Sequence, residues 1–284
     1  MPEKKEGTIT AKKVVATKKA VAETPKPPIA QGAKVNIYAL DGSVDGTVDV
    51  PNVFSSDFRP DLIRRAVNAF RANRRQAYGS GKRSGMRHSV RWSGKGQGVS
   101  RVPRIRGTMI GAQAPGTVGG RRAHPPKPET IWAQKINWKE RTKARNAALA
   151  ATRRVELLRL RGHRFNSEMT LPIVVVDKVE GMAKAEAALE MLSALNLIDD
   201  VTRCKEHTTL RAGRGKMRGR VYRSPKSLLL VVSDANEVKK GFGNLPGIDI
   251  STPAGLNAEV LAPGGDPGRL TVFSASAFEK LRGW

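Results

Sequence analysis

The stretches LPIVVVD at residues 171–177 and SLLLVVSD at residues 227–234 are runs of apolar, mostly branched residues. A strand with one wet face alternates apolar and polar residues, whereas a continuous apolar run is typical of a strand covered on both faces. GIDIST at 247–252 predicts a third strand, and RLTVFSASAFEKL at 269–281 predicts a closing strand followed by a short helix. Strand and helix alternate from Leu171 onward, which predicts an α/β fold with a mostly parallel sheet flanked by helices.

Helical segments fill the spaces between these strands. GMAKAEAALEMLSALN at residues 181–196 places Leu189, Leu192 and Leu195 near one side of a helix, and a further short helix is expected near Leu256.

The segment before the first of these strands predicts a strand pair and then helices. KVNIYALDGSVDGTVDVP at residues 34–51 alternates apolar and polar residues on both sides of an Asp41-Gly42 turn signal. Residues 59–78 predict a long helix, with Pro60 in its first turn and Gly79 as its stop. The apolar face of that helix is formed by Leu62, Ile63, Ala66, Val67 and Phe70.

Two further helices are predicted downstream. Residues 137–154 form a helical pattern in which Asn137 can cap the amino end and Glu140 lies three residues on, as in a capping box. Residues 153–161 continue as a second helical stretch.

The helical pattern stops between these helices. Residues 62–128 contain no acidic residue, and residues 86–127 are rich in glycine and arginine with no apolar periodicity. A loop of this length without its own structure is unusual inside a compact domain. We therefore expect an extended basic arm at about residues 79–130, inserted after the first long helix and ordered by a partner. A disordered basic loop is the alternative.

The charge of the whole chain indicates what that partner is. The 284 residues include 51 Lys and Arg against 25 Asp and Glu, a net charge of +26. Such a charge favours a polyanionic partner, by default nucleic acid. An anionic membrane surface would need an amphipathic anchor, and no apolar run is long enough to cross a bilayer, so no membrane partner is expected.

The arm has the chemistry of an RNA-binding element. Arginine and lysine neutralise phosphates, glycine lets the backbone approach closely, and Trp92, Trp132 and the arm's histidines offer flat surfaces to unpaired bases. A second basic, glycine-rich segment lies at residues 205–227, where a connection between strands is expected.

The remaining segments carry no sign of catalysis. Residues 1–33 are rich in lysine and alanine and end in a proline cluster, which predicts a flexible basic tail separate from a single domain at residues 34–284. GSGKRSG at 79–85 and GKGQGV at 94–99 each lack residues that phosphate and dinucleotide loops need. Cys204 and His207 alone make no zinc site. We expect no enzyme activity, no cofactor, no metal and a cytoplasmic location, for which a single cysteine is typical.

Several segments resemble the fourth large-subunit ribosomal protein family of archaea and eukaryotes. AYGSGKRSGMRHSVRWSGKGQGVSRVPRIRG at 77–107 and VGGRRAHPPKPE at 118–129 are similar to the two limbs of the family's arm. RGHRF at 161–165, RAGRGKMRGRVYRSPKSLLLVVSD at 211–234 and LAPGGDPGRLTVFSASAF at 261–278 are similar to its body. The long C-terminal extension of eukaryotic members is missing, which favours an archaeal source.

The resemblance implies a structural constituent of the large ribosomal subunit. Its partners would be large-subunit ribosomal RNA, neighbouring ribosomal proteins and the nascent polypeptide, because the family's arm lines the constriction of the exit tunnel. The tunnel tip would comprise Trp92, Lys95, Gly96, Gln97, Gly98 and Arg101. Met109, Ile110 and Ala112 lie in a part of the arm poor in basic residues and would pack on sugars or on another protein.

Charge pattern and resemblance together assign RNA contacts to residues of the first helix, the arm and the second basic segment. They are Arg71, Arg74, Arg75, Lys82, Arg83, Arg87, His88, Arg91, Trp92, Lys95, Arg101, Arg104, Arg106, Arg121, Arg122, His124, Lys127, Arg211, Arg214, Lys216, Arg218, Arg220 and Arg223. An RNA-binding regulator or an RNA-processing protein that uses the same arm is the alternative function.

Overall fold

The computed structural model describes residues 34–166 and 168–284. The basic tail expected at residues 1–33 lies outside the described residues and stays a prediction. Within the described part, the central element is a six-stranded sheet with the order β2-β1-β5-β10-β8-β9. Its strands are β1 (Lys34–Tyr38), β2 (Val44–Asp49), β5 (Ile173–Val175), β8 (Leu229–Val231), β9 (Asp249–Ser251) and β10 (Thr271–Ser274).

The sheet is mostly parallel, as the sequence predicts. β5 lies parallel to β1 and to β10, and β8 lies parallel to β10 and to β9. β2 pairs antiparallel with β1 through the turn at Gly42, which confirms the predicted strand pair. β10 is last in the chain but lies between β5 and β8, so the closing segment completes the middle of the sheet.

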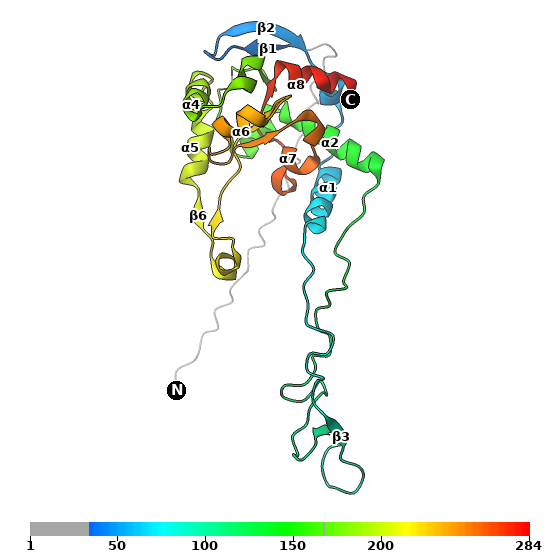
Figure 1. The fold of residues 1–284 in the computed structure, drawn as a ribbon. Helices are drawn as coiled ribbons and strands as arrows, with labels where there is room; N and C mark the ends of the chain where they lie inside the picture. Colours follow the sequence, from blue (N-terminus) through cyan, green and yellow to red (C-terminus); the bar gives the residue numbers. More distant parts are fainter. Residues whose placement is uncertain (1–33, 167) are drawn as a thin grey trace, which may run out of the picture. The chain divides into compact units, whose positions relative to one another are not determined.

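Helices cover both faces of this sheet (Figure 1). They are α1 (Pro60–Asn73), α2 (Trp138–Thr152), α3 (Val155–Leu160), α4 (Ala185–Ala194), α5 (Ile198–Glu206), α6 (Asn236–Phe242), α7 (Ala258–Leu261) and α8 (Ala275–Lys280). Short 3-10 turns lie next to strands and helices at η1 (Asn52–Ser55), η2 (Asp177–Gly181), η4 (Pro253–Gly255), η5 (Pro263–Gly265) and η6 (Leu281–Gly283).

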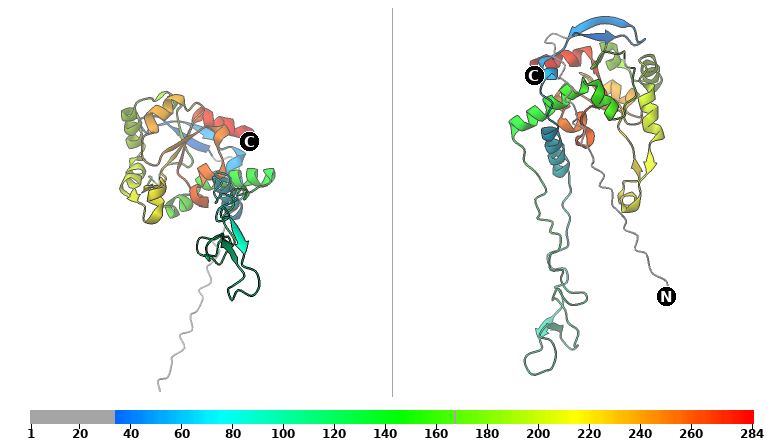
Figure 2. Two further views of the ribbon diagram at one scale, coloured as in Figure 1. Left: turned by 60° about the horizontal axis from the view of Figure 1, so that its bottom comes forward. Right: turned by 180° about the vertical axis from the view of Figure 1, so that it is seen from behind.

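The central strands divide their side chains between two apolar clusters. Val174 of β5 and Phe273 of β10 belong to one cluster, packed with α1, α2, α7 and α8. Their neighbours Ile173 and Val272 belong to the other, packed with α3, α4, α5 and α6. Successive strand residues point to opposite faces, so a strand buried on both faces must be apolar at every position. This division explains the runs at 171–177 and 227–234. Figure 2 shows the helices that surround the strands.

Two buried ionic groups form hydrogen bonds with the chain at the amino ends of the central strands. Asp200 of α5 has no exposed surface and accepts hydrogen bonds from His163 Nδ1, Arg164 N, Arg203 Nε and Ser227 Oγ. The fully buried Arg269 donates to four carbonyl oxygens, those of Ser227, Leu228, Gly247 and Val260, and pairs with Asp249 at 2.7 Å. Neither charge is left without partners, as burial in a low-dielectric interior requires.

Some local expectations were wrong. The first helix ends at Asn73 and not near Tyr78. Asn137 does occupy the cap position of α2, but its side chain makes no capping hydrogen bond, and Glu140 instead lies 3.4 Å from Arg65. Leu189 is 38% exposed, whereas Leu192 and Leu195 are buried. α5 was not predicted, because its buried positions Asp200, Val201 and Cys204 include a carboxylate.

Candidate nucleic-acid interface

The chain between α1 and α2, residues 74–137, forms two limbs that we call the arm (Figure 1). Near the two helices, the outgoing and returning limbs are joined by a hydrogen bond and by an aromatic contact. The Asn73 side-chain oxygen accepts a hydrogen bond from the Gln134 amide at 2.8 Å. The Trp132 ring is stacked with the Tyr78 ring, with 5.8 Å between the two centroids. The Arg75 guanidinium lies 3.9 Å from the centroid of the Trp132 ring. Trp132 is therefore engaged within the protein, although its sequence context predicted a platform for a base.

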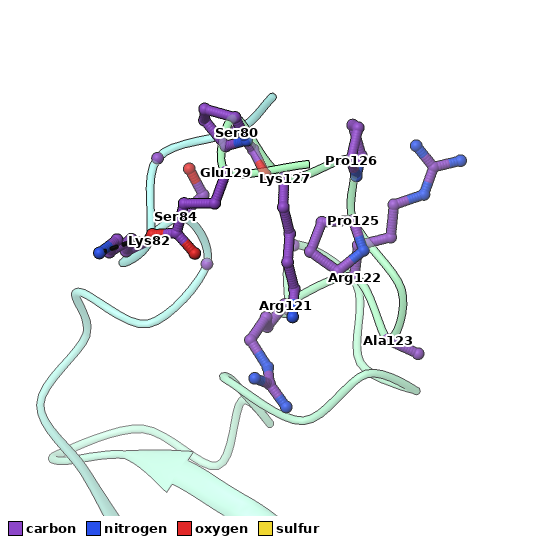
Figure 3. Close-up of a pocket in the computed structure, with 15 residues that line it drawn as sticks. Ser80, Lys82, Ser84, Arg121, Arg122, Ala123, Pro125, Pro126, Lys127 and Glu129 are labelled. Carbon is purple, nitrogen blue, oxygen red and sulfur yellow. Dashed lines mark ion pairs between the residues drawn. The ribbon is translucent and has the colours of Figure 1, made fainter. Parts of the chain in front are cut away.

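Further along, the limbs lie against each other at glycine positions. A Cβ atom on Gly79 would lie 2.4 Å from the Pro128 ring, and one on Gly85 would lie 2.8 Å from the backbone of Arg121. Gly85 also has a φ of +74°, which favours glycine. Lys82 pairs with Glu129 at 2.7 Å across the two limbs (Figure 3). The spacing of the limbs is thus set by backbone contact.

The far end of the arm is a small hairpin of β3 (Val90–Trp92) and β4 (Pro103–Ile105), which pair antiparallel. Arg104 braces it by donating to the carbonyl oxygens of Met109 and Ser100. Gln113 donates to the carbonyl oxygens of Met86 and His88 and fixes the returning chain on the hairpin's base.

The predicted tunnel-tip residues belong to this hairpin and to the loop at 93–102 that β3 and β4 enclose. Trp92 is 67% exposed, so its ring is free for contact. Gly94, Gly96 and Gly98 all have positive φ values, and a Cβ atom there would meet nothing within 4 Å. The glycines of this loop are open on its surface, and Arg104 of β4 holds its returning end at Ser100.

The apolar residues of the arm separate into two kinds. Ala112 is buried within the arm, at 4% exposure, and its amide donates to the Pro103 carbonyl at 2.8 Å. Met109 and Ile110, its close neighbours in the chain, are 59% and 62% exposed. Their side chains therefore remain available to an outside partner.

The arm's cations are exposed and mostly lack acidic partners. Of the candidate residues, only Arg104 and Arg211 are half-buried, and the others are exposed. The ion pairs recorded in the described residues engage two of them, Lys82 with Glu129 and Arg74 with Glu259. Surface pairs of this kind contribute on the order of 0–1 kcal/mol. The remaining positive charge is presented to the outside.

A second basic hairpin, residues 209–223, connects α5 to β8. It consists of β6 (Thr209–Leu210), η3 (Gly213–Arg218) and β7 (Tyr222–Arg223). Arg211 braces it by donating to the carbonyl oxygens of Arg220 and Tyr222. Arg214, Lys216, Arg218 and Arg220 are exposed, and so is the Tyr222 ring at 63%. The hairpin therefore offers cations and an aromatic surface together.

Three features of the interface were not expected from the sequence. Gly79 was interpreted as a helix stop, yet it spaces the two limbs against residues almost fifty positions away. The brace from Gln113 and the exposed Tyr222 were likewise missed. Contacts between distant positions leave no periodic signal, although exposed aromatic residues among arginines can be recognised in a sequence.

Neither a metal cluster nor a membrane helix is present in the described part of the chain. No three His, Cys, Asp or Glu side chains among residues 34–166 and 168–284 are grouped to hold a metal ion. The helices described there are all too short or too polar to span a bilayer.

The fold and the interface define an α/β protein with two basic insertions in its strand connections. Residues 48–284 match the Ribosomal protein L4/L1 family. The chain is 46% identical over 248 residues to large ribosomal subunit protein uL4 of Methanococcoides burtonii, covering 87% of this chain and 97% of that protein. It is 47% identical over 251 residues to the same-named protein of Archaeoglobus fulgidus, covering 88% and 99%. For Halobacterium salinarum the identity is 44% over 248 residues, covering 87% and 98%.

The chain therefore belongs to the ribosomal protein L4/L1 family and is of the archaeal type. The resemblance drawn from the sequence is confirmed at the level of the family.

Proposed function

We propose that this protein is a structural constituent of the large ribosomal subunit that binds large-subunit ribosomal RNA. The observation that carries the proposal is the family match over residues 48–284, supported by relatives named large ribosomal subunit proteins that align over nearly their whole length. The body anchors the protein, and the arm and the hairpin at 209–223 contact the RNA. The location is the ribosome, in the cytoplasm.

The distribution of charge supports the RNA contacts. The arm carries no acidic residue from its start until Glu129, so its exposed guanidinium and ammonium groups face a partner that must bring negative charge. A phosphate backbone provides that charge at regular intervals and releases counterions when it is neutralised. Binding of the arm to RNA would also support assembly of the subunit.

The hairpin at the far end of the arm is the part that we propose lines the exit tunnel. Its surface combines the exposed Trp92 with a loop whose glycines Gly94, Gly96 and Gly98 have open space around them. The nascent polypeptide and neighbouring ribosomal proteins are the partners expected there. Met109 and Ile110, exposed beside this loop, are suited to contact a protein surface.

We further propose that the protein acts without catalysing a reaction. The purified chain should show no turnover of RNA or nucleotides, and reproducible turnover that is abolished by substitution of a single residue would contradict this.

Sedimentation tests the main proposal. The protein should travel with the large subunit in a gradient and remain bound at moderate salt. A protein that stays at the top of the gradient, or that binds a particular messenger RNA or duplex DNA in preference to ribosomal RNA, would contradict the proposal.

A further inference from the structure

The two limbs of the arm enclose a hollow that we call the limb pocket. It lies between residues 80–85 on the outgoing limb and residues 119–129 on the returning limb (Figure 3). Its volume of about 660 Å³ falls within the range of sites that hold small organic ligands. The pocket is separate from the exposed loop at the end of the arm.

Positive charge lines the returning side of the pocket. Arg121, Arg122 and Lys127 are exposed lining residues, and no carboxylate partner is recorded for them among the described residues. The acidic lining residue Glu129 is engaged with Lys82. Figure 3 shows the Lys127 side chain reaching toward Arg121 on this wall, whereas the Arg122 guanidinium points away from both.

The same wall carries apolar surface. Pro125 and Pro126 line the pocket next to Ala123, and Figure 3 shows the two proline rings beside the basic side chains. Proline rings are rigid, and burying their apolar faces under a flat ring removes apolar area from water. A ligand that fits this wall has an apolar planar part and a negative part.

The width of the pocket is fixed by glycine at both ends. Gly79 lies against Pro126 and Pro128 at one end, and Gly85 lies against Gly120 and Arg121 at the other. A side chain at either position would push the limbs apart, so the shape of the pocket does not depend on its charges. The two properties can therefore be altered separately.

We propose that the limb pocket holds a single unpaired nucleotide of the bound RNA. Its phosphate lies on Arg121 and Lys127, and its base lies on the prolines. Bases that leave the stack are the parts of RNA that proteins read individually. The inference rests on the proposed function and adds one particular contact to it. A free phosphate would leave the proline surface unused, and an acidic peptide is the competing occupant.

The test is ultraviolet crosslinking of the full chain bound to large-subunit ribosomal RNA, with mass spectrometry to identify each peptide and nucleotide joined. We expect residues 119–129 to crosslink to one nucleotide. Replacing both cations, Arg121→Gln and Lys127→Gln, should lower the yield of that crosslink roughly tenfold or more, because both charge-assisted contacts to the phosphate are lost. The matched control, Lys178→Gln with Lys239→Gln, removes equal charge from exposed positions on the body and should keep the crosslink.

A second pair of variants alters the shape without altering the charge. In Gly85→Ala the new Cβ would meet the Arg121 backbone at 2.8 Å, so the crosslink should weaken. In Gly116→Ala the new Cβ meets nothing within 4 Å, so the crosslink should remain. Cosedimentation with the large subunit is measured for each variant in parallel.

The outcomes separate the pocket from the general function. If the protein cosediments with the subunit but residues 119–129 form no crosslink, or form one that the pocket variants leave unchanged, the nucleotide assignment is overturned. A crosslink from these residues to a protein in place of RNA overturns it as well. If the unaltered protein does not cosediment, the proposed function itself fails.

Discussion

In the body, the Asp200 carboxylate is surrounded by hydrogen-bond donors from His163, Arg203 and Ser227. In the arm, by contrast, the Arg121 and Arg122 guanidinium groups form no ion pair with an acidic residue in the described part of the chain. Burial makes the difference necessary. A charge inside the body must be compensated by the chain itself, because water cannot reach it. A charge on the arm needs no partner within the chain, because water solvates it until another molecule binds.

The same contrast holds for apolar side chains. The sheet of the body buries its strands between two clusters that include Val174, Phe273 and Val272. In the arm, Ala112 is buried while Met109, Ile110 and Val118 are exposed. The body therefore carries the fold, and the arm carries surface for other molecules.

The largest expected effect comes from breaking the charge compensation in the body. Asp200→Ala removes the acceptor of the buried donors and leaves Arg203 beside an apolar interior. Loss of one partner from a buried ion pair destabilises a protein by roughly 3–5 kcal/mol. Denaturant unfolding measures the change. Asp199→Ala, at the exposed neighbouring position in the same helix turn, is the control and should change stability little.

Lowering the pH should also remove the contribution of Asp200 to stability. Burial alone would raise the pKa of Asp200, but the hydrogen bonds from His163 and Arg203 outweigh it and lower the pKa to about 2 from an ordinary 3.8. The unfolded chain then takes up the proton first, so this stabilisation is complete above about pH 4 and is lost as the pH falls toward 2.

Unfolding curves of the unaltered protein and of Asp200→Asn should therefore converge across that interval. A constant difference in unfolding free energy from pH 5 to pH 2 would show that Asp200 does not titrate as described.

The basic hairpin provides an effect of intermediate size. Replacing Arg214, Arg218 and Arg220 with Gln should weaken RNA association and flatten its dependence on salt. The logarithmic slope should fall by roughly 0.7–0.9 for each phosphate that the variant no longer neutralises. Arg211 is kept because it braces the hairpin.

The control for the hairpin removes equal charge from exposed positions on the body, with Lys178, Lys239 and Lys280 replaced by Gln. Equal salt-dependence slopes for the two triple variants would mean that the hairpin acts only through the net charge of the protein and makes no direct phosphate contacts.

The smallest expected effect concerns the independence of the two regions. Deleting residues 89–105 should leave the unfolding free energy of the body unchanged, within roughly the 0.5 kcal/mol typical of surface changes. The deletion joins chain ends that already lie together, since Arg106 N donates to Ser89 O at 3.3 Å. Circular dichroism and denaturant unfolding measure the stability of the deletion variant. A body that unfolds after the deletion would show that the arm supports the core.

Much of the body could be predicted because its signals are local and repeat at fixed spacing. The apolar runs around Val174 and Leu230 predicted the buried strands, and the Asp41-Gly42 turn predicted the first pair. The end of α1 could not be predicted, because residues 74–78 continue the helical composition. Their position is set by the contacts of Arg75 and Tyr78 with Trp132, more than fifty residues away.

The candidate interface was predictable in composition and not in geometry. Missing acids and abundant arginine indicated the arm and the hairpin at 209–223. The sequence did not indicate which arginines support the protein itself, as Arg104 and Arg211 do through backbone carbonyls. It also did not indicate the limb pocket, which depends on Gly79 and Gly85 meeting the opposite limb.

Amide hydrogen exchange of the full chain, with and without large-subunit ribosomal RNA, tests most directly the claim that RNA is the partner of the arm. Addition of the RNA should slow exchange throughout residues 79–130 and 209–223, while the already protected amides of β5, β8 and β10 remain as they were. Exchange in the arm that is equally fast in both states, or equally slow without any RNA, would contradict the account.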